Sequence, residues 1–201
     1  MQKGTRHICV RGTLLGDEHP CDILVDGSGI VRQISGVSKS PADIGGDSFL
    51  IAPTLFDIQV NGAFGIDLQD DAVKAEDVLR LSDFLARQGI SMWVPTLITA
   101  PHASLLRRCR LLGELMQDRC FSASVPGIHL EGPYISPLDG PRGAHEKAFV
   151  RKPDLRELER LYKATGERIL YVTVAPEMDG AIPFIRAVTR MGVVVALGHH
   201  A

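Results

Sequence analysis

The sequence predicts an α/β protein whose larger part is a partial (β/α) barrel, with a small β unit before it. From Phe49 onward, apolar runs alternate with segments of helical periodicity, which is typical of βα units around a parallel sheet. Polar residues stand at or just beyond the C-terminal ends of the runs, where barrel enzymes gather their catalytic groups. These residues are Gln59, Asn61, Thr96, Glu131, Glu177 and His199. The turn after the first run lacks the GxGxxG spacing of an open doubly wound sheet, so we favour about five of a barrel's eight strands.

Short strands dominate the first fifty residues. The runs His7–Val10 and Asp22–Val25 are followed by Ile30–Ile34, and the Asp-Gly-Ser-Gly segment at 26–29 is expected to turn the second run into the third. The Gly, Ser, Pro and Asp content of Ser35–Ser48 predicts a loop or boundary there.

The remaining chain is predicted to hold five strands with four crossover helices between them. The strands are Leu55–Val60, Ser91–Thr96, Val125–Glu131, Ile169–Ala175 and Val193–His199. Each helix is recognised by apolar residues that share one face. The four faces are Val78, Leu81 and Leu85; Leu105, Cys109, Leu112 and Met116; Leu155, Leu158 and Tyr162; and Ile182, Ile185 and Val188.

Composition indicates a partner that is a small molecule. The 201 residues are 45% hydrophobic, enough for a sizeable core, and the net charge of -2 argues against a nucleic-acid or membrane surface. The only basic cluster is Arg107, Arg108 and Arg110, and helical spacing predicts that Cys109 faces inward and the arginines face solvent.

We predict a cytoplasmic protein. No apolar run follows the charges of Met1–His7, which argues against a secretory signal, and no segment is long enough to span a bilayer. The cysteines, without CxxC spacing, are expected to be reduced thiols. They are Cys9, Cys21, Cys109 and Cys120.

Two strand ends carry side chains that bind metals. Glu131 ends an apolar run at a Gly-Pro turn. It has two interpretations: a functional carboxylate, which is a metal ligand or an acid/base group, or a structural carboxylate that accepts hydrogen bonds from loop N–H groups. Taken alone, His199 is most simply interpreted as a histidine whose ring forms a hydrogen bond with a backbone carbonyl. Because Glu131 stands two strands earlier, we favour a metal ligand. The neighbouring His200 is an alternative ligand, since adjacent strand residues point to opposite sides.

Three further polar residues are candidates for contacts near these ligands. His145 lies in a Gly-containing loop beyond Glu131; by itself it is best interpreted as an exposed loop histidine, and otherwise as a substrate contact. Gln59 and Asn61 alternate after the first strand, so they are expected to face the same side. Their amides form hydrogen bonds well but are poor ligands for borderline cations.

With these residues described, the chain resembles the N-acetylglucosamine-6-phosphate deacetylases of the amidohydrolase superfamily. The resemblance rests on an ordered series of motifs over nearly the whole chain. The motifs are Ala52–Gly62 continued by Phe64–Asp67, Pro95–Leu97, His129–Tyr134 followed by Lys147–Pro153, Val172–Glu177, and Leu197–His199. A serine usually follows the last histidine in the family, and here it is His200.

The resemblance implies a TIM-like barrel over residues 52–201 and part of a small β-sandwich over residues 1–51. It also implies one divalent metal per subunit, zinc as judged from the family, with Glu131 and His199 as two of its three ligands. Ala144 and His145 match the family's substrate-contacting pair, and Gln59 and Asn61 are further expected substrate contacts. Gln59-Val60-Asn61 replaces the His-x-His that binds a second metal in other superfamily members.

The reaction so implied is hydrolysis of the N-acetyl group of N-acetylglucosamine 6-phosphate to glucosamine 6-phosphate and acetate, in a homodimeric enzyme. The third ligand and the catalytic aspartate are expected beyond Ala201, so we expect this chain alone to be poorly soluble or to associate, without appreciable activity. One alternative is a dihydroorotase-like or imidazolonepropionase-like cyclic amidase, against which the missing His-x-His argues. The other is a non-catalytic half-barrel that binds sugar phosphate or nothing.

Overall fold

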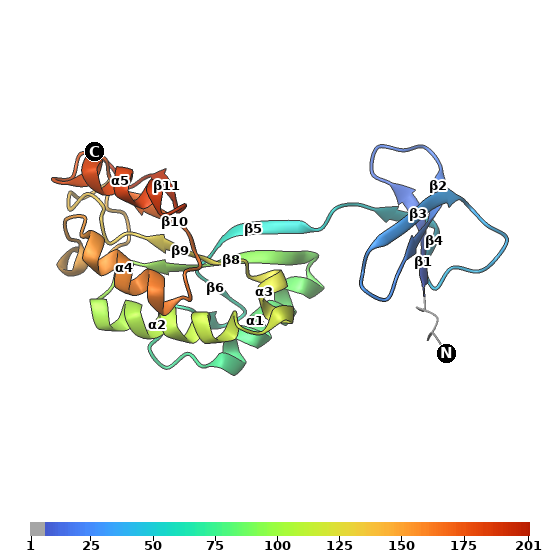
Figure 1. Cartoon of the computed structure of the whole chain (residues 1–201), viewed down its shortest axis with the longest axis horizontal. Helices are drawn as coiled ribbons and strands as arrows, with labels where there is room; N and C mark the ends of the chain where they lie inside the picture. Colours follow the sequence, from blue (N-terminus) through green and yellow to red (C-terminus); the bar gives the residue numbers. More distant parts are fainter. Residues whose placement is uncertain (1–6) are drawn as a thin grey trace. The chain divides into compact units, whose positions relative to one another are not determined.

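The computed structural model describes residues 7–201, which divide into two compact units on either side of the Pro53–Thr54 bond. Figure 1 draws the first unit in blue and the second from cyan to red. The prediction that no secretory signal is present rests mainly on residues 1–6, which lie outside the described part. No helix between residues 7 and 201 has the length and apolar character needed to cross a membrane.

The first unit is a four-stranded sheet in the order β3-β2-β1-β4. Its strands are β1 (Ile8–Leu14), β2 (Pro20–Val25), β3 (Val31–Gly36) and β4 (Ile44–Ile51). The expected turn between β2 and β3 forms because the Asp26 carboxylate accepts hydrogen bonds from the N–H groups of Ser28 (2.9 Å) and Ile30 (3.1 Å). The hydrogen bond from Ser28 Oγ, together with these two, holds the pKa of Asp26 well below its usual range.

The prediction of a loop over Ser35–Ser48 is wrong for its last part, because β4 begins at Ile44. Ile44 and Gly45 pair in parallel with Val10 and Arg11 of β1. Gly45 has φ +82°, and a Cβ there would collide with the Arg11 carbonyl oxygen, so glycine is required for this close approach. Pairing with a strand distant in sequence therefore makes this segment a strand, against its local composition.

The second unit contains a parallel five-stranded sheet in the order β11-β10-β9-β8-β5, as predicted. The strands are β5 (Leu55–Val60), β8 (Ile90–Ile98), β9 (Ile128–Glu131), β10 (Ile169–Val174) and β11 (Val194–Leu197). A short hairpin that the sequence did not predict, β6 (Gly62–Ala63) with β7 (Ile66–Asp67), follows β5. Because the five strands are parallel, their C-terminal ends lie along one edge.

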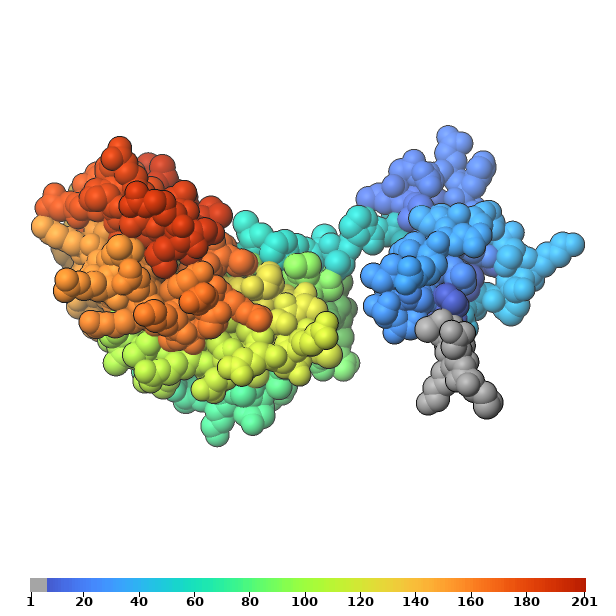
Figure 2. Space-filling view, in the orientation of Figure 1, coloured from blue at the N-terminus to red at the C-terminus, as the bar shows by residue number. Residues whose placement is uncertain are grey.

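Helices cover this sheet and bury most of the predicted apolar faces. They are α1 (Ala75–Arg87), α2 (His102–Leu115), α3 (Arg119–Ser124), α4 (Leu155–Ala164) and α5 (Ala181–Arg190), with a 3-10 turn η1 at Lys147–Phe149. The predicted faces of α1 and α2 are fully buried. Figure 2 shows α2 and α4, in yellow-green and orange, in contact side by side. The unpredicted α3 begins where Asp118 accepts the N–H groups of Cys120 and Phe121.

Two predictions about helix faces are wrong. Ile182 is 53% exposed, because the buried residues of α5 are Ala181, Phe184 and Val188; of the predicted face, Val188 is buried and Ile185 packs partly buried against the core. Arg108 is only 7% exposed, although Cys109 beside it is buried as expected. The Arg108 guanidinium binds a loop carbonyl and a carboxylate before α1, acceptors that helical periodicity does not reveal.

Candidate metal centre

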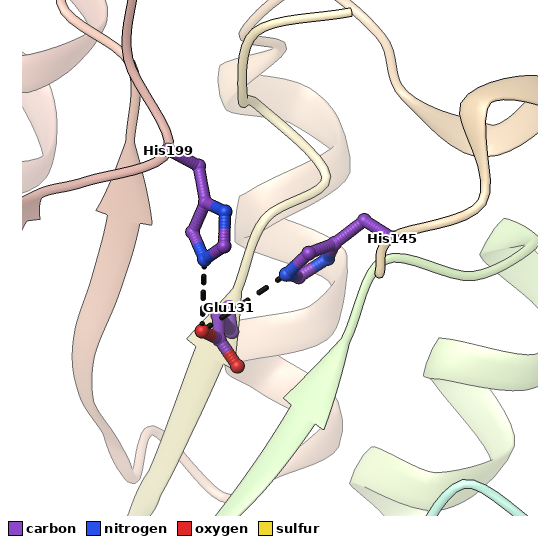
Figure 3. Close-up of side chains that lie close together, drawn as sticks. All are labelled: Glu131, His145 and His199. Carbon is purple, nitrogen blue, oxygen red and sulfur yellow. Dashed lines mark hydrogen bonds and ion pairs between the residues drawn. The ribbon is translucent and has the colours of Figure 1, made fainter. Parts of the chain in front are cut away.

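Glu131, His145 and His199 converge where the parallel strands end (Figure 3). Glu131 is the last residue of β9, His199 follows β11, and His145 lies in the loop after β9. Glu131 Oε1 is 3.0 Å from His199 Nε2 and 3.9 Å from His145 Nε2. One donor atom from each side chain lies within 4.8 Å of the other two, which is close enough for one ion to contact all three.

The hydrogen-bond partners of the two histidines assign their tautomers. His199 Nδ1 is 3.0 Å from the Pro141 carbonyl oxygen, which only accepts, so Nδ1 carries a proton. In the arrangement in which Thr99 Oγ1 donates to the Glu131 carbonyl oxygen (3.4 Å), His145 Nδ1 donates to the Thr99 hydroxyl across the 2.8 Å contact. In the neutral rings, both Nε2 lone pairs therefore face the Glu131 carboxylate.

This convergence of acceptors suits a cation. A proton on His199 Nε2 would satisfy its 3.0 Å contact with Glu131, but His145 Nε2, at 3.9 Å, is beyond hydrogen-bond distance. Burial lowers the pKa of His145, and the neighbouring His199 lowers it further, which favours the neutral ring that binds metals. The second ring nitrogen of each histidine is oriented by an oxygen, as in known metal sites.

The loop after Glu131 is fixed against the strand ends. Gly132 has φ +82°, and a Cβ there would collide with Thr99 Oγ1, so a glycine lets the loop approach β8 closely. Ser136 N donates to the His199 carbonyl oxygen (2.9 Å), which ties the same loop to the end of β11. The loop that carries His145 is thus held by both neighbouring strand ends.

A cavity of about 400 Å³ opens at these side chains. Its lining residues are Asn61, Asp67, Gln69, Ile98, Glu131, Ala144, His145 and His199. Gln59 reaches the same carboxylate from the edge strand β5, because its Nε2 donates to Glu131 Oε2 (3.2 Å). Amide groups and two imidazoles therefore surround one carboxylate, an arrangement able to hold a metal and a polar ligand together.

Similar proteins point to one family. The chain is 32% identical over 185 residues to the N-acetylgalactosamine-6-phosphate deacetylase of Escherichia coli O157:H7, covering 92% of this chain and 47% of that protein. It is 33% identical over 169 residues to the human N-acetylglucosamine-6-phosphate deacetylase, covering 81% and 39%. No protein-family model matches the chain.

Solved structures agree. An N-acetyl-D-glucosamine-6-phosphate deacetylase mutant from Mycobacterium smegmatis, in complex with N-acetyl-D-glucosamine-6-phosphate, superimposes with a TM-score of 0.84 at 30% identity over 96% of this chain and 50% of that one. Over most of its length, the chain is similar to part of the N-acetylglucosamine-6-phosphate deacetylases. It spans about half the length of these relatives, and its five-stranded sheet matches a half-barrel of the deacetylase structures.

The structure gathers the site residues that the deacetylase resemblance predicted. Glu131 and His199 face each other, and Ala144, His145 and Asn61 line the same cavity. The interpretation of His145 as an exposed loop residue is wrong, because it is 5% exposed. The assignment of metal and substrate roles to these residues stays a prediction.

Other candidates from the sequence lie outside this three-residue group. His200 is exposed and takes no part in the three-residue group. Glu177 accepts the backbone N–H of Ala201 (2.8 Å). Thr96 is not at a strand end, because β8 continues to Ile98, and its hydroxyl contacts Nδ1 of His129 (3.2 Å). Burial lowers the pKa of this His129, which lies beneath the site, to about 4.

Sequence reasoning missed Thr99, Gln69 and the Pro141 carbonyl, which orient the histidines of the candidate site or line its cavity. The only available signal for Thr99 was its place just after a strand that proved longer than predicted. Gln69 stands in a polar turn, where an amide side chain carries no pattern that identifies its partner.

Proposed function

We propose that this chain belongs to a metal-dependent amide hydrolase that removes the N-acetyl group of N-acetylglucosamine 6-phosphate, giving glucosamine 6-phosphate and acetate. The observation that carries the proposal is the convergence of Glu131, His145 and His199 in one cavity, on a chain similar to deacetylases over most of its length. A divalent ion bound there would lower the pKa of a water molecule and polarise the acetyl carbonyl.

Glu131 and His199 are the proposed ligands. Donor atoms on a tetrahedral zinc lie about 3.3 Å apart, given metal–donor bonds of about 2.0–2.1 Å. The 3.0 Å separation between Glu131 Oε1 and His199 Nε2 is close to this value, whereas the 3.9 Å to His145 Nε2 is longer. We therefore assign His145 to the substrate, at the border of the metal site, with Ala144, Gln59 and Asn61 as further substrate contacts.

The finer architecture is also a proposal. We assign residues 52–201 to a TIM-like (β/α) barrel and residues 1–51 to part of a β-sandwich, supported by the likeness to the Mycobacterium smegmatis enzyme. A homodimeric, cytoplasmic enzyme with zinc as its metal is proposed from the family resemblance.

Zinc titration of the purified chain tests the ligand assignment. We expect one zinc per chain, measured by competition with a chromophoric chelator. Glu131→Gln and His199→Asn should each lose more zinc affinity than the roughly 10–100-fold that is lost when an outer-shell partner of a metal ligand is substituted. His145→Gln should weaken zinc binding much less. Equal losses in all three variants would make His145 a ligand, and unchanged affinity in Glu131→Gln would refute the proposed centre.

A second candidate substrate is N-acetylgalactosamine 6-phosphate, because the Escherichia coli relative named for that sugar covers 92% of this chain. Calorimetric titration with both acetylated sugar phosphates and with dihydroorotate separates these substrates. Preference for N-acetylglucosamine 6-phosphate supports the proposal, preference for its epimer supports the second candidate, and binding of the cyclic amide alone contradicts both.

A further inference from the structure

Gln69 lies at the rim of the candidate metal centre and binds the end of β8 through its side chain. Its Nε2 donates to the Thr96 carbonyl oxygen (2.8 Å), and its Oε1 accepts the N–H of Ile98 (3.0 Å). Both polar atoms of the carboxamide are thus used by one strand, so Gln69 is a structural partner of β8 in addition to lining the cavity.

The carboxamide takes the place of a missing strand residue. The last pair between β5 and β8 is Val60 with Pro95, after which the chain leaves the sheet at Asn61. In a parallel pair, the N–H of a residue donates to one carbonyl oxygen of the neighbouring strand. The carbonyl oxygen of the same residue accepts the N–H that lies two residues further along that neighbouring strand. Thr96 and Ile98 supply this pair of groups, and the Gln69 amide extends the ladder one step beyond β5.

The backbone of Gln69 is itself held in place. Its N–H donates to Asp67 Oδ1 (2.8 Å), and its carbonyl oxygen accepts a hydrogen bond from the buried Arg108. Asp71 Oδ1 accepts a second bond from the same Arg108 nitrogen (2.9 Å). Two side chains from different segments therefore fix the turn that presents the carboxamide, which limits the entropy lost when it binds β8.

The strand end that Gln69 supports borders the metal centre on its other side. Ile98 pairs with Glu131 of β9. The next residue, Thr99, contacts His145 Nδ1 (2.8 Å) and donates to the Glu131 carbonyl oxygen (3.4 Å). A displacement of Ile98 would therefore move the hydroxyl that orients His145.

We propose that Gln69 is a positioning residue of the candidate metal centre: it holds the end of β8, so that Ile98 and Thr99 keep the backbone of the ligand Glu131 in place and Thr99 orients His145. The inference rests on the proposed function, because the centre it supports is the one proposed to hold the metal. Gln69 acts through Thr99 and is not itself a ligand.

Gln69→Met tests this role in the full chain, since it keeps the length of the side chain and removes both hydrogen bonds. Gln117→Met is the matched control, because Gln117 is exposed and lies after α2, away from the cavity. We expect Gln69→Met to speed hydrogen exchange of the Ile98 amide and to weaken zinc binding about 10-fold, the lower end for outer-shell partners. The cobalt-substituted chain should show an altered visible spectrum in Gln69→Met and an unchanged one in Gln117→Met.

Gln69→Asn provides a second variant if Gln69→Met does not fold. It keeps the amide but is one methylene too short to reach both Thr96 and Ile98, so the same direction of change is expected. A double-mutant cycle with Thr99→Val tests the path: if Gln69 acts through Thr99, the loss in zinc affinity in the double variant is smaller than the sum of the two single losses.

The outcomes separate the inference from the proposed function. Zinc affinity in Gln69→Met equal to that of Gln117→Met, or losses that simply add in the cycle, would overturn the positioning role alone. A wild-type chain whose zinc binding does not depend on Glu131 would overturn the proposed centre itself, and with it the role of Gln69.

Discussion

Replacing Gly132 by alanine should destabilise the second unit far more than a comparable glycine substitution elsewhere. At φ +82° an L-residue costs about 1–2 kcal/mol relative to glycine. The new Cβ would also displace Thr99 Oγ1, which leaves the N–H of the buried His145 unpaired, at about 1–3 kcal/mol. We therefore expect Gly132→Ala to lower the free energy of unfolding by about 2–5 kcal/mol.

Urea unfolding followed by tryptophan fluorescence measures this loss. The single tryptophan, Trp93, is fully buried in β8 and reports on the unit that contains Gly132. Gly166→Ala is the matched control, because Gly166 has φ +66° and a Cβ added there would meet no atom within 4 Å. It should lose only the conformational part, about 1–2 kcal/mol. Equal losses in the two variants would show that the contact with Thr99 carries no energy and would refute the reasoning.

Three other predictions follow from contacts outside the centre. Arg151→Met should lower the free energy of unfolding by about 2–4 kcal/mol, because the buried Glu157 carboxylate loses its bidentate partner. The control Arg156→Met, at an exposed position, should change the free energy of unfolding by less than about 0.5 kcal/mol. Equal urea midpoints in the two variants would contradict this prediction. Tyr134→Phe removes a 3.1 Å hydrogen bond to Glu157 and should cost about 1 kcal/mol by the same assay, and no loss would mean that water replaces the hydroxyl. The hydrogen bond from Arg11 holds the pKa of the Asp22 carboxyl well below its value in the unfolded chain. The stability that Asp22 gives to the first sheet is therefore complete above about pH 4 and is lost as the pH falls further. Hydrogen exchange of the β2 amides should show this pH dependence in the wild type and not in Asp22→Asn.

Periodicity predicted the fold well where each segment has one buried face. The five parallel strands and the buried faces of α1 and α2 are confirmed, since burial of apolar side chains on one face is both what the pattern records and what stabilises these elements. Periodicity failed where a partner distant in sequence determines the structure or the burial of a residue. Ile44–Ser48 becomes a strand through pairing with β1, and Arg108 is buried because a loop carbonyl and Asp71 accept its hydrogen bonds.

The same distinction applies to the candidate site. Glu131 and His199 could be selected because parallel strands bring their C-terminal ends to one edge, whatever the loops do. Gln69 could not, because its partners are backbone groups of a strand distant in sequence, and any polar residue in a turn has the same local signature.

His145 shows why the loop matters as much as the strands. The proton on its Nδ1 is placed by Thr99, and that on His199 Nδ1 by the Pro141 carbonyl, so neither imidazole is oriented by its own segment of chain. The direction of both Nε2 lone pairs therefore depends on the loop from Gly132 to His145 packing against β8 and β11. An ion held by Glu131 and His199 must stabilise the packed loop by the same free energy with which the packed loop stabilises ion binding. Zinc should accordingly slow hydrogen exchange at the amide of Ser136, which bonds the His199 carbonyl, and this protection should be lost in Glu131→Gln.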